Sequence, residues 1–135
     1  MNVLGINHLT LAVSNVEEAF RFYAGLLGFK PVMKSEVAAY VTVGGAWIAL
    51  VADGRPAREN ESHIAFDVAE EDFEASVAEL MRAGVHEWPK GGTEGDSFFF
   101  LDPSGNRLEL HVGGMRDRLA YGRLYWTRKV EWFEP

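Results

Sequence analysis

Three side chains of the types that bind divalent metal ions occur at similar places in predicted strands. They are His8, next to the alternating run LTLAV (9–13), His63, next to IAFDV (64–68), and Glu109, within RLELHV (107–112). Because strand side chains alternate between two faces, each of the three lies opposite large apolar side chains that are expected in the core. Two imidazoles and one carboxylate are a common ligand set for a metal ion that keeps positions open for a substrate. The sequence therefore raises the hypothesis of metal-assisted chemistry.

Each candidate ligand has a simpler structural interpretation. A single histidine on a strand more often makes a structural hydrogen bond than a metal bond. Here two histidines occupy equivalent positions 55 residues apart, which favours metal binding. His111 shares its predicted face with Glu109 and is the rival ligand, whereas His86 follows a predicted helix end and is expected at the surface. The chain has no cysteine, which excludes a thiolate ligand, a disulfide and a cysteine nucleophile.

The elements that must position these side chains form a repeated pattern of a strand, a helix and further strands. A shift of 55 residues aligns the apolar faces of the two strands: Leu9 with Ile64, Leu11 with Phe66 and Val13 with Val68. The first predicted helix begins after Asn15, ends at Gly28 and has the apolar stripe Ala19, Phe20, Tyr23, Leu26 and Leu27. The second ends at Gly84 and has the stripe Phe73, Val77, Leu80 and Met81. This pattern indicates a tandem duplication.

A hairpin follows each helix. AAYVTV (38–43) turns at Gly44-Gly45 into WIALV, and SFFFL (97–101) turns at DPSG (102–105) into RLELHV. Each half is too short to build a robust core alone, so we expect a single domain over residues 1–135. Its parts are module one (about 4–53), a linker (54–61), module two (about 62–113) and an aromatic C-terminal tail (114–135) expected to cover a neighbouring surface.

The composition excludes several classes of function. A hydrophobic content of 47% and a charged content of 24% are ordinary for a globular protein. The formal charge of −7 argues against a nucleic-acid surface. No apolar run is long enough to span a membrane, and the N-terminus lacks the features of a signal peptide. We therefore expect a cytoplasmic protein with no nucleic-acid and no membrane partner.

The motifs NHLTLAV, EGDSF, FLDPSG and LELHVG followed by RDRL occur in this order between about residues 4 and 119. With this set the chain resembles the vicinal oxygen chelate superfamily, which includes glyoxalases and bleomycin-resistance proteins. More closely it is similar to the fosfomycin-resistance thiol transferases, particularly the glutathione-using (FosA-type) enzymes. The resemblance implies an α+β fold of tandem βαβββ modules. It also implies a homodimer in which module one of each chain pairs with module two of the other.

The resemblance also implies a reaction and the residues at its centre. His8 would bind Mn²⁺ together with His63 and Glu109 of the partner subunit, and the ion would hold the phosphonate and epoxide oxygens of fosfomycin. Thr10 matches the active-site threonine of the family, near the place where the thiol attacks. The sulfur of glutathione, the co-substrate, would attack an epoxide carbon while charge develops on the leaving oxygen.

Further matches concern binding of the substrate and of a second ion. The segment KGGTEGDS corresponds to a potassium-binding loop, in which Glu94, Gly95 and Ser97 match directly and Thr93 replaces a serine. Arg118 matches an arginine that contacts the phosphonate, a role that suits a forked and permanently charged guanidinium. Without the resemblance, the loop would be interpreted as an exposed glycine-rich turn and Arg118 as a surface arginine. The remaining expected substrate contacts are Ser97, Thr93, Lys90, Trp47 and Tyr40, of which the two aromatic residues would otherwise be ordinary core.

Two departures from the family pattern leave other functions open. A phosphonate-binding lysine aligns with Pro89, one residue before Lys90, and a phosphonate-contacting tyrosine aligns with Phe99. Each weakened contact would cost about 1–3 kcal/mol of binding. The alternatives are a glyoxalase, for which Ala49 lacks the further ligand, an Fe²⁺-dependent extradiol dioxygenase, which has a longer chain, and a drug-sequestering dimer, which lacks the metal ligands.

Overall fold

The structure is a computed structural model that describes residues 1–55, 60–88 and 94–133. Module one contains β1 (Leu9–Val13), α1 (Val16–Phe20), η1 (Arg21–Leu26), β2 (Lys30–Lys34), β3 (Ala38–Val43) and β4 (Ala46–Ala52). Module two contains β5 (Ile64–Asp67), α2 (Glu70–Arg82), β6 (Ser97–Leu101) and β7 (Arg107–His111). One further helix, α3 (Met115–Tyr125), follows. The expected α+β class is confirmed.

The two modules form two sheets that are paired in the same way. The first sheet has the order β1-β4-β3-β2 and the second has the order β5-β7-β6. In each, the first strand runs parallel to the last strand, and their registers are equivalent: Thr10 pairs with Ala49, and Ala65 pairs with Glu109. The shift of 55 residues aligns Thr10 with Ala65. Their strand partners, Ala49 and Glu109, therefore occupy equivalent positions in the two modules. This register confirms the predicted duplication.

The segment of module two that corresponds to β2 is described only in part. Where β2 stands in module one, the described residues of module two contain a single bridge between Glu87 and Phe100. The main chain adds hydrogen bonds from Trp88 N to Phe99 O and from Leu101 N to His86 O. The next residue in the chain is Pro89, which has no N–H group to donate to a ladder, and Pro89–Thr93 lie outside the described residues.

The helices begin and end at the predicted residues but differ in detail. Asn15 caps α1 by accepting a hydrogen bond from Glu18 N (2.8 Å), and Gly28 has the left-handed conformation (φ +74°) that ends the helical segment. From Arg21 the helix continues as the π-helix η1, whose wider turn buries Phe22 together with Tyr23. The prediction for Met81 was wrong: it lies at the edge of the stripe on α2 and is 56% exposed.

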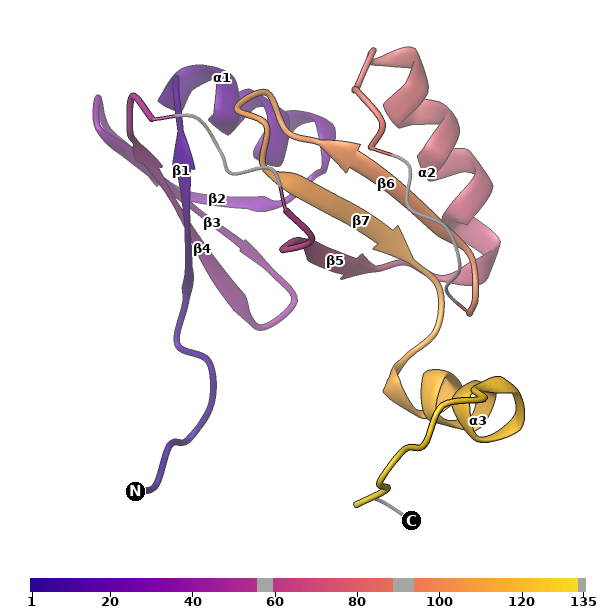
Figure 1. Ribbon diagram of the computed structural model, residues 1–135. Helices are drawn as coiled ribbons and strands as arrows, with labels where there is room; N and C mark the ends of the chain where they lie inside the picture. Colours follow the sequence, from indigo (N-terminus) through magenta and orange to yellow (C-terminus); the bar gives the residue numbers. More distant parts are fainter. Residues whose placement is uncertain (56–59, 89–93, 134–135) are drawn as a thin grey trace.

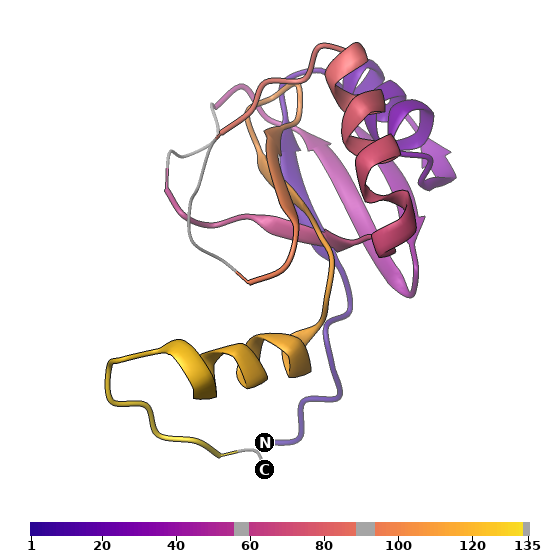
Figure 2. The same ribbon diagram turned by 90° about the vertical axis from the view of Figure 1, so that its right-hand side faces the viewer.

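The helices α1 and α2 lie on the same face of the sheets, and the core fills the space between (Figures 1 and 2). The core combines both modules: Val13, Val41, Ile48 and Leu50 from the first sheet, Phe100 and Leu108 from the second, and Tyr23 and Leu80 from the helices. Residues 1–8 and α3 extend away from this body on the same side (Figure 2). Within the described parts of the chain, no helix has the length and apolar character needed to cross a membrane.

Candidate metal and anion site

The candidate site lies on the face of the second sheet that points away from the core. Because Ala65 pairs with Glu109 and Ser97 pairs with His111, alternate residues of three strands meet on this face. Leu108 and Leu110 of the same strand point into the core. The side chains of Glu109 and His111 are only 4% and 9% exposed, so polar groups are withdrawn from water here. Such groups need partners, because an unpaired buried charge costs several kcal/mol.

His63 and Glu109, two of the three predicted metal ligands, are in contact. His63 Nε2 lies 3.0 Å from Glu109 Oε1, and His63 Nδ1 lies 2.7 Å from the carbonyl oxygen of Glu61. A carbonyl can only accept, so Nδ1 carries the hydrogen of that bond and Nε2 is directed at the carboxylate. Metal-binding histidines are commonly held in this way: one ring nitrogen binds the metal, and the other donates its hydrogen to a main-chain carbonyl or a carboxylate, which fixes the orientation of the ring. The donor atoms therefore fit a divalent metal ion.

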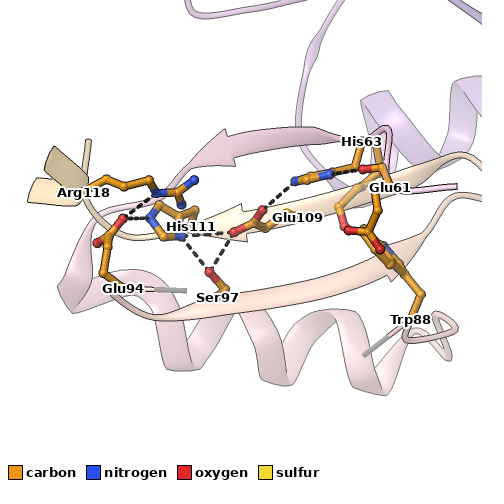
Figure 3. Close-up of polar contacts among 9 residues, drawn as sticks. Glu61, His63, Trp88, Glu94, Ser97, Glu109, His111 and Arg118 are labelled. Atoms are coloured by element: carbon orange, nitrogen blue, oxygen red, sulfur yellow. Dashed lines mark hydrogen bonds and ion pairs between the residues drawn. The ribbon is translucent and has the colours of Figure 1, made fainter. Parts of the chain in front are cut away.

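A chain of polar contacts leads from Glu109 to Arg118 (Figure 3). Ser97 Oγ donates to Glu109 Oε2 (2.7 Å) and lies 2.6 Å from His111 Nδ1. His111 Nε2 lies 3.3 Å from Glu94 Oε1, an ion-pair distance without the alignment of a hydrogen bond. The same Glu94 oxygen accepts a hydrogen bond from Arg118 Nε (2.9 Å). The structure thus brings predicted metal ligands and predicted anion contacts onto one face.

Aromatic side chains enclose His63 on one side. The ring centroids of His63, Trp88 and Phe99 are 5.1–6.0 Å apart in edge-on arrangements. Trp88 Nε1 donates to the carbonyl oxygen of Leu108 (3.0 Å), and the Arg107 guanidinium lies over the Trp88 ring at 5.2 Å. The part of a ligand that approaches this wall would meet apolar ring surface rather than a hydroxyl group. The sequence signal for Phe99 was its departure from the family pattern, whereas Trp88 and Glu61 were missed because no motif marks them.

The other predicted site residues lie on the first sheet. The ring of His8 lies on Trp47 at 4.5 Å between centroids, and Trp47 contacts Tyr40 at 5.1 Å. His8 Nδ1 lies 2.8 Å from Asn7 Oδ1, which can only accept, so Nε2 of His8 is the nitrogen left for a further partner. Thr10, on the same face, is exposed. Asn7 was also missed by the sequence analysis.

Within one chain the three predicted metal ligands do not form one group. No set of three histidine, aspartate or glutamate side chains suited to a metal ion occurs among the described residues. His8 lies with Trp47 on the first sheet, whereas His63 and Glu109 lie on the second. Thr10 and His63 do line one groove of about 580 Å³ between β1 and β5. The complete ligand set, expected from two chains, stays a prediction.

The predicted potassium loop is described only in part. Gly95 has φ +74°, and a Cβ atom there would lie 2.5 Å from the carbonyl oxygen of Val112, so the turn between Glu94 and Ser97 requires glycine. Thr93, Lys90 and Pro89 lie outside the described residues.

Known proteins share the family and the fold of this chain. Residues 5–110 match the family model of the Glyoxalase/Bleomycin resistance protein/Dioxygenase superfamily, and the chain belongs to this superfamily. It is 44% identical over 120 residues to the glutathione transferase FosA of Serratia marcescens, which covers 85% of each chain. It is 39% identical to the metallothiol transferase FosB of Shouchella clausii, over 88% of this chain and 87% of that protein. The crystal structure of the fosfomycin resistance protein FosX from Mesorhizobium loti superposes with a TM-score of 0.76 at 27% identity, covering 87% of this chain and 99% of that one. The predicted resemblance is confirmed.

Proposed function

We propose that this chain is a metal-dependent thiol transferase that adds glutathione to the epoxide of fosfomycin. The observation that carries the proposal is the polar face of the second sheet. There a candidate metal-binding pair, His63 and Glu109 (the metal-type end), is connected to a candidate anion-binding arginine, Arg118, which Glu94 holds (the anion-type end). A small phosphonate with an epoxide needs both kinds of contact at once. The relatives support the same assignment, since they are named a glutathione transferase, a metallothiol transferase and a fosfomycin resistance protein.

The metal ion is proposed to be Mn²⁺, held by His8 of one chain and by the partner subunit's His63 and Glu109. When bound, such an ion polarises an oxygen of the substrate and stabilises negative charge on it. The proposal requires a homodimer, because His8 and the other two ligands lie on different sheets of one chain. In both histidines Nδ1 is already engaged, by Asn7 in one case and by Glu61 in the other, which leaves Nε2 as the ligating atom.

The other residues bind and orient the substrates. The Arg118 side chain is 45% exposed, so its guanidinium can pair with a phosphonate while Glu94 fixes its direction. Ser97 provides a hydroxyl beside Glu109, and Trp47 and Tyr40 provide apolar walls. We propose that Thr10 lies near the attacking thiol and that Glu94, Gly95 and Ser97 border a K⁺ site. Thr93 and Lys90 are proposed as further anion contacts. A cytoplasmic location would supply glutathione.

A glyoxalase-like reaction is less well supported. Ala49 occupies the register position in module one that corresponds to Glu109, and its methyl group provides no ligand atom. The fourth protein ligand expected of a glyoxalase is therefore lacking at that position.

Mass spectrometry of the reaction mixture tests the proposal. The protein is loaded with Mn²⁺ and K⁺ and incubated with fosfomycin and either glutathione or L-cysteine, and the mass of the adduct is sought. We expect a glutathione adduct that disappears without metal and in His63→Ala, whereas His86→Ala, at an exposed histidine, retains it. Tight Mn²⁺ binding without a glutathione adduct would contradict glutathione transfer, and an adduct with cysteine alone would reassign the thiol.

A further inference from the structure

His111 lies between the two ends of the candidate site and has no role in the proposed reaction so far. It is buried, and Glu109 is two residues before it on the same strand. Each of its ring nitrogens faces a different carboxylate: Nδ1 lies 3.1 Å from Glu109 Oε2, and Nε2 lies 3.3 Å from Glu94 Oε1. One imidazole thus spans the distance between the metal-type end and the anion-type end (Figure 3).

The contacts at Nδ1 fix the metal-type end. Ser97 Oγ donates to Glu109 Oε2 at 2.7 Å and contacts His111 Nδ1 at 2.6 Å, so Ser97 is held between the two side chains. The remaining carboxylate oxygen, Oε1, is then directed at His63 Nε2. Removal of the group at Nδ1 would take away one of the contacts that hold Ser97 and would also take away the direct contact with Glu109 Oε2, so Glu109 would be less firmly oriented.

The contacts at Nε2 support the anion-type end. The Glu94 side chain is only 8% exposed. Its Oε1 atom accepts a hydrogen bond from Arg118 Nε on one side and, on the other, lies at ion-pair distance from His111 Nε2 without hydrogen-bond alignment. The loop also packs on the imidazole, since a Cβ atom at Gly95 would lie 3.4 Å from His111 Cε1. The position of Glu94, and with it the direction of Arg118, therefore depends on the ring of His111.

We propose that His111 is a positioning residue with two separable ends, and not a metal ligand. Its Nδ1 end orients Glu109 through Ser97 and so controls metal affinity. Its Nε2 end holds Glu94 and Arg118 and so controls affinity for the anionic group of the substrate. The inference rests on the proposed function for the metal site and for the identity of that anion.

Two isosteric substitutions separate the ends. The amide of Asn reaches the position of Nδ1, and the amide of Gln reaches that of Nε2. We expect His111→Asn to keep Mn²⁺ affinity within about 3-fold of the unmodified chain and His111→Gln to lower it about 10- to 100-fold, the usual effect of removing a support of a metal ligand. Mn²⁺ affinity is measured by electron paramagnetic resonance without substrate.

The anion end is measured by calorimetric titration of fosfomycin into the protein saturated with Mn²⁺. Here we expect the opposite order: His111→Asn weakens fosfomycin binding about 10-fold, and His111→Gln weakens it less. His111→Leu removes both ends and should weaken both affinities. His86→Asn and His86→Gln, at an exposed histidine, are the matched controls and should change neither.

The outcomes discriminate between the possible roles. Loss of Mn²⁺ binding in His111→Asn, to the extent seen in His63→Ala, would make His111 a ligand and overturn the proposal. Equal losses of both affinities in the Asn and Gln variants, with a lowered melting temperature, would show a purely structural residue. If the unmodified chain does not bind fosfomycin, the proposed function fails, and the Mn²⁺ affinities of the Asn and Gln variants alone decide whether His111 positions Glu109.

Discussion

Glu109 is a nearly buried carboxylate whose two oxygens have different partners. Oε1 lies beside His63 and Oε2 accepts from Ser97. Since a carboxylate withdrawn from water is stable only when it is paired, each partner has a large effect on the orientation of the Glu109 carboxylate. At the scale of single residues, the site therefore depends on a few short contacts rather than on a high net charge.

Phe99 provides a prediction at this scale. The resemblance predicts a phosphonate-contacting tyrosine at this position, and the ring of Phe99 lies beside His63 and Trp88. We expect Phe99→Tyr to lower KM for fosfomycin about 5- to 10-fold with a smaller change in kcat, because a restored hydrogen bond to a charged group contributes about 1–1.5 kcal/mol. Steady-state kinetics at saturating glutathione measures the effect.

Phe133→Tyr, at a ring that is 85% exposed, is the control and should leave KM unchanged. An unchanged KM in Phe99→Tyr would mean that the phosphonate does not approach this ring.

At the scale of elements, the turn before β6 positions both Glu94 and Ser97. A Cβ atom at Gly95 would lie 2.5 Å from the main-chain oxygen of Val112, and the residue also has a positive φ. We expect Gly95→Ala to lower the free energy of unfolding by about 2–4 kcal/mol and to raise KM for fosfomycin, because the turn must open to relieve the contact. Urea unfolding and steady-state kinetics measure the two effects.

Gly44→Ala is the matched control for this variant. Gly44 also has a positive φ (+56°), but no atom lies within 4 Å of the Cβ position. It should cost only about 1 kcal/mol, the usual cost of the left-handed conformation, and leave KM unchanged. Equal costs at the two positions would contradict the predicted clash.

The turn between β6 and β7 makes side-chain hydrogen bonds to module one. Tyr23 Oη of η1 donates to Asp102 Oδ2 at 2.7 Å, and Asn106 Nδ2 donates to Asp102 Oδ2 and to the carbonyl oxygen of Ala12. Burial, followed by the charge of Asp102, raises the pKa of Tyr23 well above its ordinary value. The neutral phenol therefore stabilises the fold at pH values below about 10, and this contribution is lost as the pH rises above 10, where the unfolded chain ionises first.

Tyr23→Phe tests this assignment. We expect the variant to lose about 1–3 kcal/mol of unfolding free energy at pH 8, because Asp102 loses a buried donor. Above pH 10 the difference between the two proteins should shrink by about 1.4 kcal/mol per pH unit, since only the unmodified chain contains this tyrosine. Urea unfolding at pH 8, 10 and 11 measures the difference, and a difference that is independent of pH would contradict a raised pKa.

At the scale of the whole molecule, the exposed apolar residues favour a second copy of the chain as the partner. Leu4 and Ile6 of the N-terminal arm are 94% and 84% exposed, and Leu124 of α3 is 76% exposed. The arm and α3 extend from the body on the same side (Figure 2). Such surface is costly to leave in water, and the arm leads directly to His8.

Mixing two inactive variants tests whether the site forms between chains. We expect His8→Ala and Glu109→Ala to be inactive alone. In a site shared between chains, unfolding and refolding them together should restore about one quarter of the activity, because half of the dimers are mixed and each mixed dimer has one intact site of two. The adduct assay measures the recovery.

A mixture of His63→Ala and Glu109→Ala is the control. Both ligands come from the same chain in the proposed site, so every site in that mixture lacks one of them and no activity should return. Recovery in neither mixture would indicate a site contained within one chain.

Local sequence patterns determined the strand faces, the pairing of the sheets and the ends of the first helical segment. The alternation of apolar residues predicted the faces of His8 and His63, which directly precede β1 and β5, and of Glu109 in β7. The 55-residue repeat predicted the equivalent pairing of both sheets. Asn15 and Gly28 marked the ends of the first helical segment because capping is a local interaction. The patterns did not predict the π-helix η1, whose Phe22 packs against Phe100 of the other module, or the exposure of Met81.

Only the tertiary structure decided which side chains meet. It placed His63 against Glu109 and His8 against Trp47, on separate sheets of one chain. It also placed His111 between Glu109 and Glu94. These contacts join residues from different strands and loops, and their geometry depends on strand register and core packing, which no local pattern in the sequence contains.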